Sequence, residues 1–217
     1  MDPLFLAVQS TYQGIELALY HGNFSDAQTF IDKKAATANL VSAIDRQLCA
    51  AGVTLDQLSF IAVNQGPAPF TTLRVVIATI NGISFARNLP LVGVDGLRAF
   101  LAPYHDNVYT LALLNAFAGQ LYFALKGPGT FLVGVDAASS VLAQVDALIG
   151  DHQVTVIGNG ASLFQDAINQ TFGIRAQINT PLEEFPPLSA IAASALKQWP
   201  MAQPVYRLLP LYLKQAL

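Results

Sequence analysis

The chain has 217 residues and a formal net charge of -3 at pH 7; 53% of it is hydrophobic and only 12% is charged. An ordinary soluble domain carries roughly 25% charged residues, so we expect part of this surface to be apolar and covered by another protein. The acidic balance and the lack of Lys and Arg clusters argue against a nucleic-acid-binding surface supplied by this chain alone, so any link to RNA would run through a partner.

The first half of the chain alternates strand-like and helix-like segments. Apolar runs bounded by turn residues predict strands at 4–10, 15–20, 27–31, 60–63 and 91–94. Longer periodic segments predict helices at 36–51, 70–87 and 96–101. The predicted order is three strands, a helix, a strand, a helix, a strand and a short helix.

The second half begins the same plan again after Pro103. The predicted strands are a hairpin at 108–125, an edge strand near Phe131 and a strand at 153–157, and the predicted helices lie at 138–148, 161–168 and 189–199. Two copies of one plan predict an α/β protein with the duplicated actin-like and sugar-kinase-like (ASKHA) fold, made of two packed βββαβα-type subdomains. We predict an N-terminal subdomain at 1–102 and a C-terminal subdomain with its tail at 103–217.

The uncharged run at 108–125 raises the alternative of a membrane span, since ~20 apolar residues cross a bilayer. Asn115 and Gln120 interrupt its middle, which favours two strands joined by a turn. The start, Met1-Asp2-Pro3, lacks the basic residues and apolar core of a signal peptide. Cys49 is the single cysteine, which suits a reducing compartment. We therefore expect a cytoplasmic protein with no membrane partner.

A strand, a Gly/Pro turn and a helix start meet in residues 64–74, which read Asn-Gln-Gly-Pro-Ala-Pro-Phe-Thr-Thr-Leu-Arg. The segment resembles the Gly-Pro-Gly-Ser-Phe-Thr-Gly-[Leu/Val]-Arg motif of the TsaB family, also called YeaZ. The matching positions are Gly66, Pro67, Phe70, Thr71, Leu73 and Arg74, whereas Ala68, Pro69 and Thr72 differ from the motif. Because the resemblance continues through residues 90–94 and the strands around Asn115 to 204–206, the chain is identified as a divergent member.

The same segment can be tested as an anion cradle, because helix N-termini after a glycine-rich turn often bind phosphates. Pro67 and Pro69 lack the N–H donors that a cradle needs, and Ala68 stands where a glycine would allow close approach. The remaining candidate anion contacts are Thr71, Thr72 and Arg74. A rigid turn, with Pro69 just before or at the first helical position, is the favoured interpretation.

Active proteins of this fold hold nucleotide phosphates between two hairpins that carry carboxylates. Gln9 and Asn115 stand where the resemblance leads us to expect Asp, and an amide carries no charge to hold hydrated magnesium. The bulky Phe117 lies in the second turn and weakens a phosphate role further. Gly158-Asn159-Gly160 could contact an adenosine, but a plain turn explains these residues better. We expect no cofactor of its own, with ATP or ADP, if anywhere, at the interface of a complex.

No catalytic or metal-binding residues are predicted. His21, His105 and His152 form no pair at metal-ligand spacing. The catalytic relative TsaD carries a His-x-x-x-His pair in its first helix, and the corresponding residues 33–39 contain no histidine here. A hydrolase nucleophile with a plausible base is also lacking.

The two long helices of the first half have few charges, and we predict that they bind a partner. On the second helix Val75, Val76, Thr79, Ile80, Ile83 and Ala86 are expected to face the sheet, and Phe70, Arg74, Ile77, Asn81, Ser84 and Phe85 to face outward. On the first helix Leu40, Val41, Ile44 and Leu48 are expected inside, and Asn39, Ala43, Arg46 and Ala50 outside. The two outer faces could form half of a four-helix bundle.

The alternative is that this chain's own C-terminal segment covers the helices, through Tyr206, Leu208, Leu209, Leu211, Tyr212 and Leu213.

The resemblance implies a non-catalytic subunit of the TsaD-containing complex that forms N6-threonylcarbamoyladenosine in tRNA next to the anticodon. Its implied partners are a TsaD-like enzyme, a TsaE-like ATPase and, in isolation, a second copy of itself, with tRNA reached only through the complex. An ATP-dependent small-molecule kinase of the same fold is the alternative, and an inactive peptidase-like relative is a third, weaker reading.

Overall fold

The computed structural model describes residues 2–201 and 203–213, so Met1 lies outside the described residues. The described chain divides into two compact units. Among the described residues, the first unit holds those up to Gly96 together with 188–211, and the second holds 97–187 and 212–213. This division differs from the predicted boundary after residue 102, because a segment distant in sequence returns to complete the first unit.

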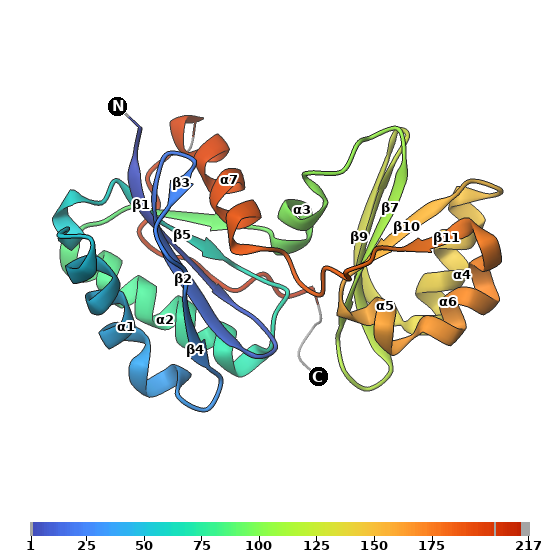
Figure 1. Ribbon diagram of the computed structural model, residues 1–217, viewed down its shortest axis with the longest axis horizontal. Coiled ribbons are helices and arrows are strands. Elements are labelled where there is room, and N and C mark those ends of the chain that lie inside the picture. The colour runs from blue at the N-terminus through green and yellow to red at the C-terminus, as the bar shows by residue number, and fades with distance from the viewer. Residues whose placement is uncertain (1, 202, 214–217) are drawn as a thin grey trace. The chain divides into compact units, whose positions relative to one another are not determined.

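The first unit is built on a mixed sheet with the strand order β3-β2-β1-β5-β6 and with β4 also paired to β2 (Figure 1). The strands are β1 (Leu4–Ser10), β2 (Gly14–His21), β3 (Phe24–Ser25), β4 (Thr29–Asp32), β5 (Phe60–Asn64) and β6 (Leu91–Val94). Strand β1 pairs antiparallel with β2 and parallel with β5, which in turn is parallel to β6. All five residues of β5 are buried, as expected for an apolar strand covered on both faces.

Helices cover both faces of this sheet (Figure 1). α1 (Ala36–Ala50) and α2 (Phe70–Arg87) pack together on one face, and α7 (Leu188–Gln198) packs on the other. On the first unit, Trp199 in the short helix η3 (Trp199–Met201) stacks on Phe60 at 4.6 Å between ring centroids, and Phe60 stacks on Phe5 at 4.5 Å. This aromatic stack explains why the late α7 segment belongs to the first unit, because burial of large rings dominates core energetics.

The second unit repeats the plan with the strand order β11-β10-β7-β8-β9. The strands are β7 (Tyr109–Asn115), β8 (Gln120–Gly127), β9 (Thr130–Ala137), β10 (Val154–Ile157) and β11 (Ala176–Ile178). Its helices are α3 (Gly96–Leu101), α4 (Ala138–Ile149), α5 (Asn159–Leu163) and α6 (Gln165–Phe172), with a single 3-10 turn at η2 (Gly173–Arg175). The first unit has a 3-10 turn at η1 (Leu55–Gln57).

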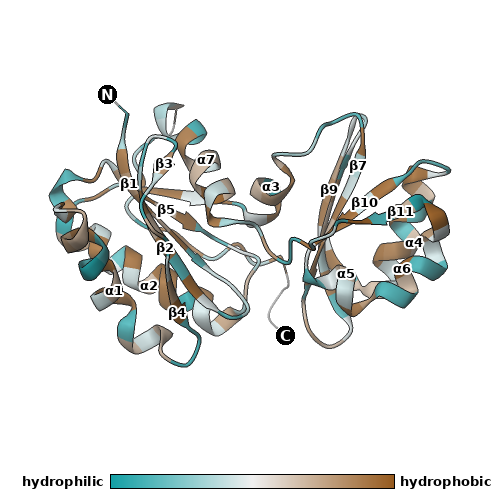
Figure 2. Cartoon of the chain, in the orientation of Figure 1, coloured by the Kyte–Doolittle hydropathy of each residue, from teal (hydrophilic) through white to brown (hydrophobic). Residues whose placement is uncertain are grey.

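Alternation along β7 divides the core of the second unit into two layers. Leu111 and Leu113 pack with residues of α4 and α6, such as Val141. Ala112 and Leu114 point to the other face, where Phe100 of α3 contributes. The brown strands and the mixed colours of the outer helices in Figure 2 show the same division between apolar interior and polar surface.

Most predicted elements are present, and the differences are local. The predicted helix at 161–168 is two helices, α5 and α6, separated at Phe164, whose backbone (φ -120, ψ 27) is not helical. The short strands β3 and β11 were missed, and the third predicted strand begins at Thr29 rather than Ala27. The run 108–125 forms the β7–β8 hairpin, and in the described chain no helix is both long and apolar enough to span a membrane.

Candidate functional site

The motif segment is a tight turn between β5 and α2, closed by side-chain and backbone hydrogen bonds. Asn64 at the end of β5 accepts a hydrogen bond from the N–H of Gly66 at 2.9 Å. The carbonyl of Gly66 accepts from the N–H of Gly96, also at 2.9 Å. Pro69 is the N-cap residue of α2, where its missing N–H costs nothing. This arrangement is rigid, and the turn uses its polar backbone internally.

The C-terminal segment of the same chain lies over this turn. The N–H of Leu211 donates to the carbonyl of Gln65 at 2.8 Å, and the Gln65 side chain donates to the carbonyl of Leu209 at 2.7 Å. Of the candidate anion contacts, Thr72 is buried, and the guanidinium of Arg74 lies 3.8 Å from the ring centroid of Phe70. The geometry is therefore closer to the predicted rigid turn than to an open anion cradle.

The first hairpin position is occupied by a buried amide network. The Gln9 side chain is fully buried, donates to Glu16 Oε2 at 2.6 Å and accepts from Asn64 Nδ2 at 3.3 Å. Glu16 was not singled out in the sequence, although it lies directly opposite Gln9 in the antiparallel register of β1 and β2. The neighbouring Ser10 Oγ is buried without a hydrogen-bond partner in the described chain. The one carboxylate at this hairpin is thus already bound by an amide.

The second hairpin and the Gly158 loop are held together by asparagines. Asn115 Oδ1 accepts from the N–H of Phe117 at 2.8 Å, and Asn159 Oδ1 accepts from the N–H of Asn115 at 2.9 Å. Phe117 has a positive φ of 61° in this turn and is 55% exposed. Asn115 therefore shapes the turn, which is a common role for this side chain.

Gly158 is required by close packing in this loop. Its φ is +92°, and a Cβ there would lie 2.2 Å from the carbonyl oxygen of Leu113. The N–H groups of Gly158 and Asn159 donate to the carbonyls of Glu183 and Glu184, both at 2.8 Å. These donors serve the chain's own fold, which favours the plain turn over an adenosine contact.

The sequence predicted no metal-binding or catalytic residues. Among the described residues, no group of three or more His, Cys, Asp or Glu could hold a metal ion.

Several predicted outward residues of α1 and α2 are instead covered. Asn39, Arg46, Ala50, Phe70 and Arg74 are exposed, as predicted. Ala43 is only 1% exposed, on the side of α1 that packs in the first unit, so its predicted outward position is wrong. The predicted outward positions of Ile77 and Ser84 are wrong too, since both side chains are buried, and Asn81 is half-buried.

The chain's own C-terminal segment explains the positions of Asn81 and Ser84. Asn81 Nδ2 donates to the carbonyl of Leu208 at 2.9 Å, and Asn81 Oδ1 accepts from the N–H of Leu208 at 2.8 Å. Ser84 Oγ lies 3.1 Å from the carbonyl of Tyr206 and 2.7 Å from that of Leu89. Leu208 is 7% exposed, whereas Leu209 is 64% exposed. The alternative of cover by the C-terminal segment therefore holds for this side of α2.

The predicted inward faces are also shifted. Val41 on α1 is 61% exposed rather than inside, and Ala86 on α2 is exposed. Phe85 was predicted outward and is 88% exposed. α2 has apolar residues on all sides, so the spacing of its apolar residues does not define a single buried face. The predicted buried face of α2 is therefore rotated about the helix axis from the observed one.

A shallow apolar cavity of about 280 Å³ lies between α1 and α2, and we call it the α1–α2 groove. Its lining includes Val41, Leu48 and Cys49 of α1 and Ile83 and Arg87 of α2. At its rim Arg87 forms a salt bridge of 2.7 Å with Asp56. Exposed apolar side chains beside an apolar groove are typical of a protein-binding surface.

Comparisons with known proteins show the family to which the chain is similar. The family model described as "TsaD: tRNA N6-adenosine threonylcarbamoyltransferase" matches residues 31–198. The chain is 27% identical over 127 residues to the tRNA threonylcarbamoyladenosine biosynthesis protein TsaB of Buchnera aphidicola subsp. Schizaphis graminum, covering 57% of this chain and 60% of that protein. It is 25% identical to TsaB of Escherichia coli (strain K12) over 55% of this chain and 53% of that protein. The matches thus span about half of these relatives.

Solved structures confirm the predicted fold class. YeaZ from Pseudomonas aeruginosa matches with a TM-score of 0.75 and 21% identity, covering 97% of this chain and all of that one. A ROK family protein from Streptococcus pneumoniae matches with a TM-score of 0.55 and 9% identity over 92% of this chain and all of that one. At these identities the likeness establishes the duplicated actin-like fold.

Proposed function

The chain belongs to the TsaD family of tRNA N6-adenosine threonylcarbamoyltransferases as a divergent TsaB-type member, and we propose that it is a non-catalytic subunit of the complex that forms N6-threonylcarbamoyladenosine in tRNA. The observation that carries this proposal is the pair of altered hairpins. The Gln9 amide binds Glu16 and Asn64 on the neighbouring strands, and the Asn115 amide closes its own turn. A subunit without phosphate-binding carboxylates at these positions would contribute through its surface.

The kinase alternative requires a carboxylate free to orient magnesium at one of the hairpins. Glu16 is the carboxylate at the first hairpin, and it accepts a 2.6 Å hydrogen bond from Gln9. The similarity to relatives named for threonylcarbamoyladenosine biosynthesis supports the subunit role over the kinase.

The surface we assign to the partner is the exposed side of α1 and α2. It comprises Asn39, Val41, Arg46 and Ala50 on α1, and Phe70, Arg74 and Phe85 on α2, around the α1–α2 groove. Ala43, Ile77 and Ser84 support this surface from beneath, and Asn81 is engaged by the C-terminal segment. Exposed aromatic and Arg side chains are the residues most often enriched in binding hot spots.

The partner that binds this surface is a TsaD-like protein. A second copy of this chain would bind the same surface when that partner is absent. A TsaE-like ATPase would join the assembled complex, ATP or ADP would bind at an interface within it, and tRNA would be reached only through it. The net charge of -3 supports an indirect route to RNA. We place the protein in the cytoplasm, which the single cysteine suits.

The proposal is tested by light scattering of the chain alone and mixed with its cognate TsaD-like protein. Val41→Glu and Phe85→Glu place a charge on exposed positions of the surface and should weaken association at least tenfold, because an unpaired charge would be buried at the interface. Ile174→Glu is the matched control, since Ile174 is 97% exposed on the second unit. No association of the unmodified chain, or equal association of all three variants, would refute the proposed surface. Magnesium-dependent ATP turnover by the isolated chain would favour the kinase.

A further inference from the structure

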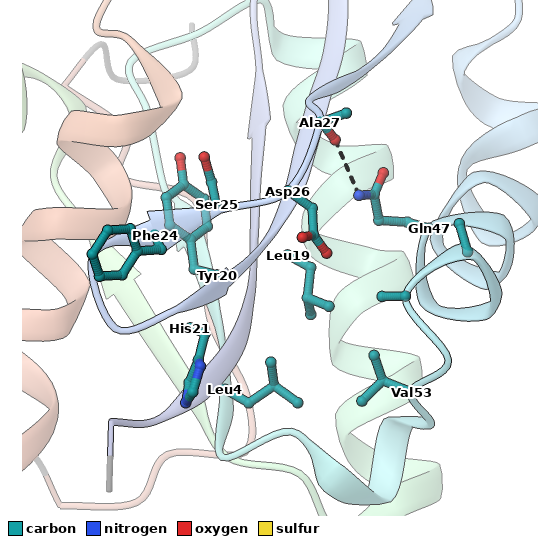
Figure 3. A pocket seen from close by; sticks show the side chains of 12 residues that line it. Leu4, Leu19, Tyr20, His21, Phe24, Ser25, Asp26, Ala27, Gln47 and Val53 are labelled. Atoms are coloured by element: carbon teal, nitrogen blue, oxygen red, sulfur yellow. Dashed lines mark hydrogen bonds between the residues drawn. The ribbon is translucent and has the colours of Figure 1, made fainter.

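A second cavity in the first unit, of about 560 Å³, lies between the β2–β3 hairpin and the C-terminal end of α1 (Figure 3). Its walls are largely apolar. Leu4 and Leu19 come from β1 and β2, Ala50 and Ala51 from the end of α1, and Val53 from the segment after it. The sequence pattern gave no indication of this cavity, because its lining comes from four separate segments.

One carboxylate, that of the exposed residue Asp26, lies at the opening of this space. Among the described residues that line the cavity, Asp26 is the one acidic residue, and there is no Lys or Arg. Figure 3 shows its carboxylate between Leu19 and Gln47. Within the described chain, no residue forms a hydrogen bond or an ion pair with the Asp26 side chain.

Among the other polar side chains of the cavity, that of Gln47 is already engaged. Gln47 Nε2 donates to the carbonyl of Ala27 at 3.0 Å, and Gln47 Oε1 accepts from Thr29 at 2.5 Å. Burial raises the pKa of the Tyr20 phenol, which therefore stays neutral. The His21 ring adds an aromatic edge. Asp26 is the acidic side chain of the cavity, and its exposed carboxylate is open to a ligand.

The surrounding charge favours a cation. The last turn of α1 borders the cavity, contains no basic residue and carries the negative end of the helix dipole. The side chain of Asp2 lies against Gly22 in the β2–β3 turn and adds a second carboxylate beside His21. Both features would repel an anion, and a fully apolar ligand would gain nothing from the Asp26 carboxylate.

We propose that this cavity binds an organic cation, an ammonium or guanidinium on an aliphatic body, with the charge at Asp26 and the aliphatic part against Leu19, Leu4 and Val53. The cation can come from a free amine or from a Lys or Arg side chain of a protein partner. The cavity shares Val53 with the α1–α2 groove and Ala50 with the proposed partner surface, whereas Asp26 belongs to neither, so the site does not depend on the proposed function.

The test compares two probes of equal length, pentylamine and pentanol, titrated into the ¹⁵N-labelled full chain. Saturable shifts of the amides of residues 24–27 and 50–53 are expected with the amine, at least fivefold stronger in affinity than with the alcohol. Asp26→Asn should lower the amine affinity about fivefold, which corresponds to the upper range for an exposed ion pair, and remove the preference for the amine. Asp151→Asn, an exposed residue of the second unit, makes the same charge change and should leave binding unchanged.

Ala50→Trp gives an independent check, because the larger side chain fills the mouth of the cavity and should abolish the shifts in a folded protein. No saturable shifts with pentylamine, or equal affinities for Asp26→Asn and the unmodified chain, would overturn the proposal. Association with the TsaD-like protein then distinguishes the sources. A loss of that association in Asp26→Asn identifies a basic side chain of the partner, and unchanged association together with weakened amine binding identifies a free cation.

Discussion

Replacing Asn81 with Ala should detach the C-terminal segment from α2 and measure how strongly it is held. The Asn81 amide makes two hydrogen bonds with the backbone of Leu208, at 2.9 and 2.8 Å, and Leu208 is only 7% exposed. A net hydrogen bond contributes about 0.5–1.5 kcal/mol, and an unsatisfied buried partner costs about 1–3 kcal/mol. Water reaches the half-buried Asn81 and partly replaces the lost hydrogen bonds, which lowers the total cost of the replacement. We therefore expect the free energy of unfolding to fall by about 2 kcal/mol.

The assay is urea denaturation followed by circular dichroism, with Asn39→Ala as the control. Asn39 is exposed on α1, and its replacement should change the free energy of unfolding by less than about 0.5 kcal/mol. In a chain that lacks residues 203–217, Asn81→Ala should also cost less than about 0.5 kcal/mol, because the partner of the amide is gone. Equal effects of Asn81→Ala and Asn39→Ala in the full chain, or an undiminished effect in the shortened chain, would refute the cover of α2 by the C-terminal segment.

Two further predictions concern the second unit. In thermal melts, Gly158→Ala should destabilise it by about 3 kcal/mol or more, because the new Cβ would lie 2.2 Å from the carbonyl oxygen of Leu113 at a φ of +92°. The control Gly150→Ala has a φ of +56° and open space around the new Cβ, and it should cost about 1 kcal/mol. Burial, together with the Glu183 carboxylate 3.1 Å away, raises the pKa of Tyr104 to about 12. The neutral Tyr104 phenol therefore contributes fully to stability below pH 10, and this contribution is lost as the pH rises to about 12. Between pH 10 and 12 the free energy of unfolding should fall less in Tyr104→Phe than in the unmodified chain. Ultraviolet titration showing a Tyr104 phenolate near pH 10 would contradict the assignment.

Local patterns in the sequence were sufficient for much of the fold. The buried runs at β1 and β5 and the turn residues around them define strands, because a run of apolar residues between Gly, Pro and Asn admits few other structures. The repeated order of elements was sufficient to predict the duplicated fold. The return of α7 to the first unit was missed, since the stacking of Trp199 on Phe60 joins residues far apart in the chain.

The candidate site was predicted less completely. Gln9 and Asn115 were identified from their positions in the two hairpins, but Glu16 was not, because only the register of β1 and β2 places it against Gln9. The cavity around Asp26 could not be predicted for the same reason, since its lining depends on how the β2–β3 hairpin meets the end of α1.

The sequence by itself determined the elements, their order and the motif turn at 64–74, because these depend on neighbours within a few residues. Tertiary structure alone decided which sides of α1 and α2 remain open. α2 is apolar on every side, so its own residues cannot select a buried face. The selection comes from α1 and from backbone groups near Leu208, which bind Asn81 and Ser84 from more than a hundred residues along the chain.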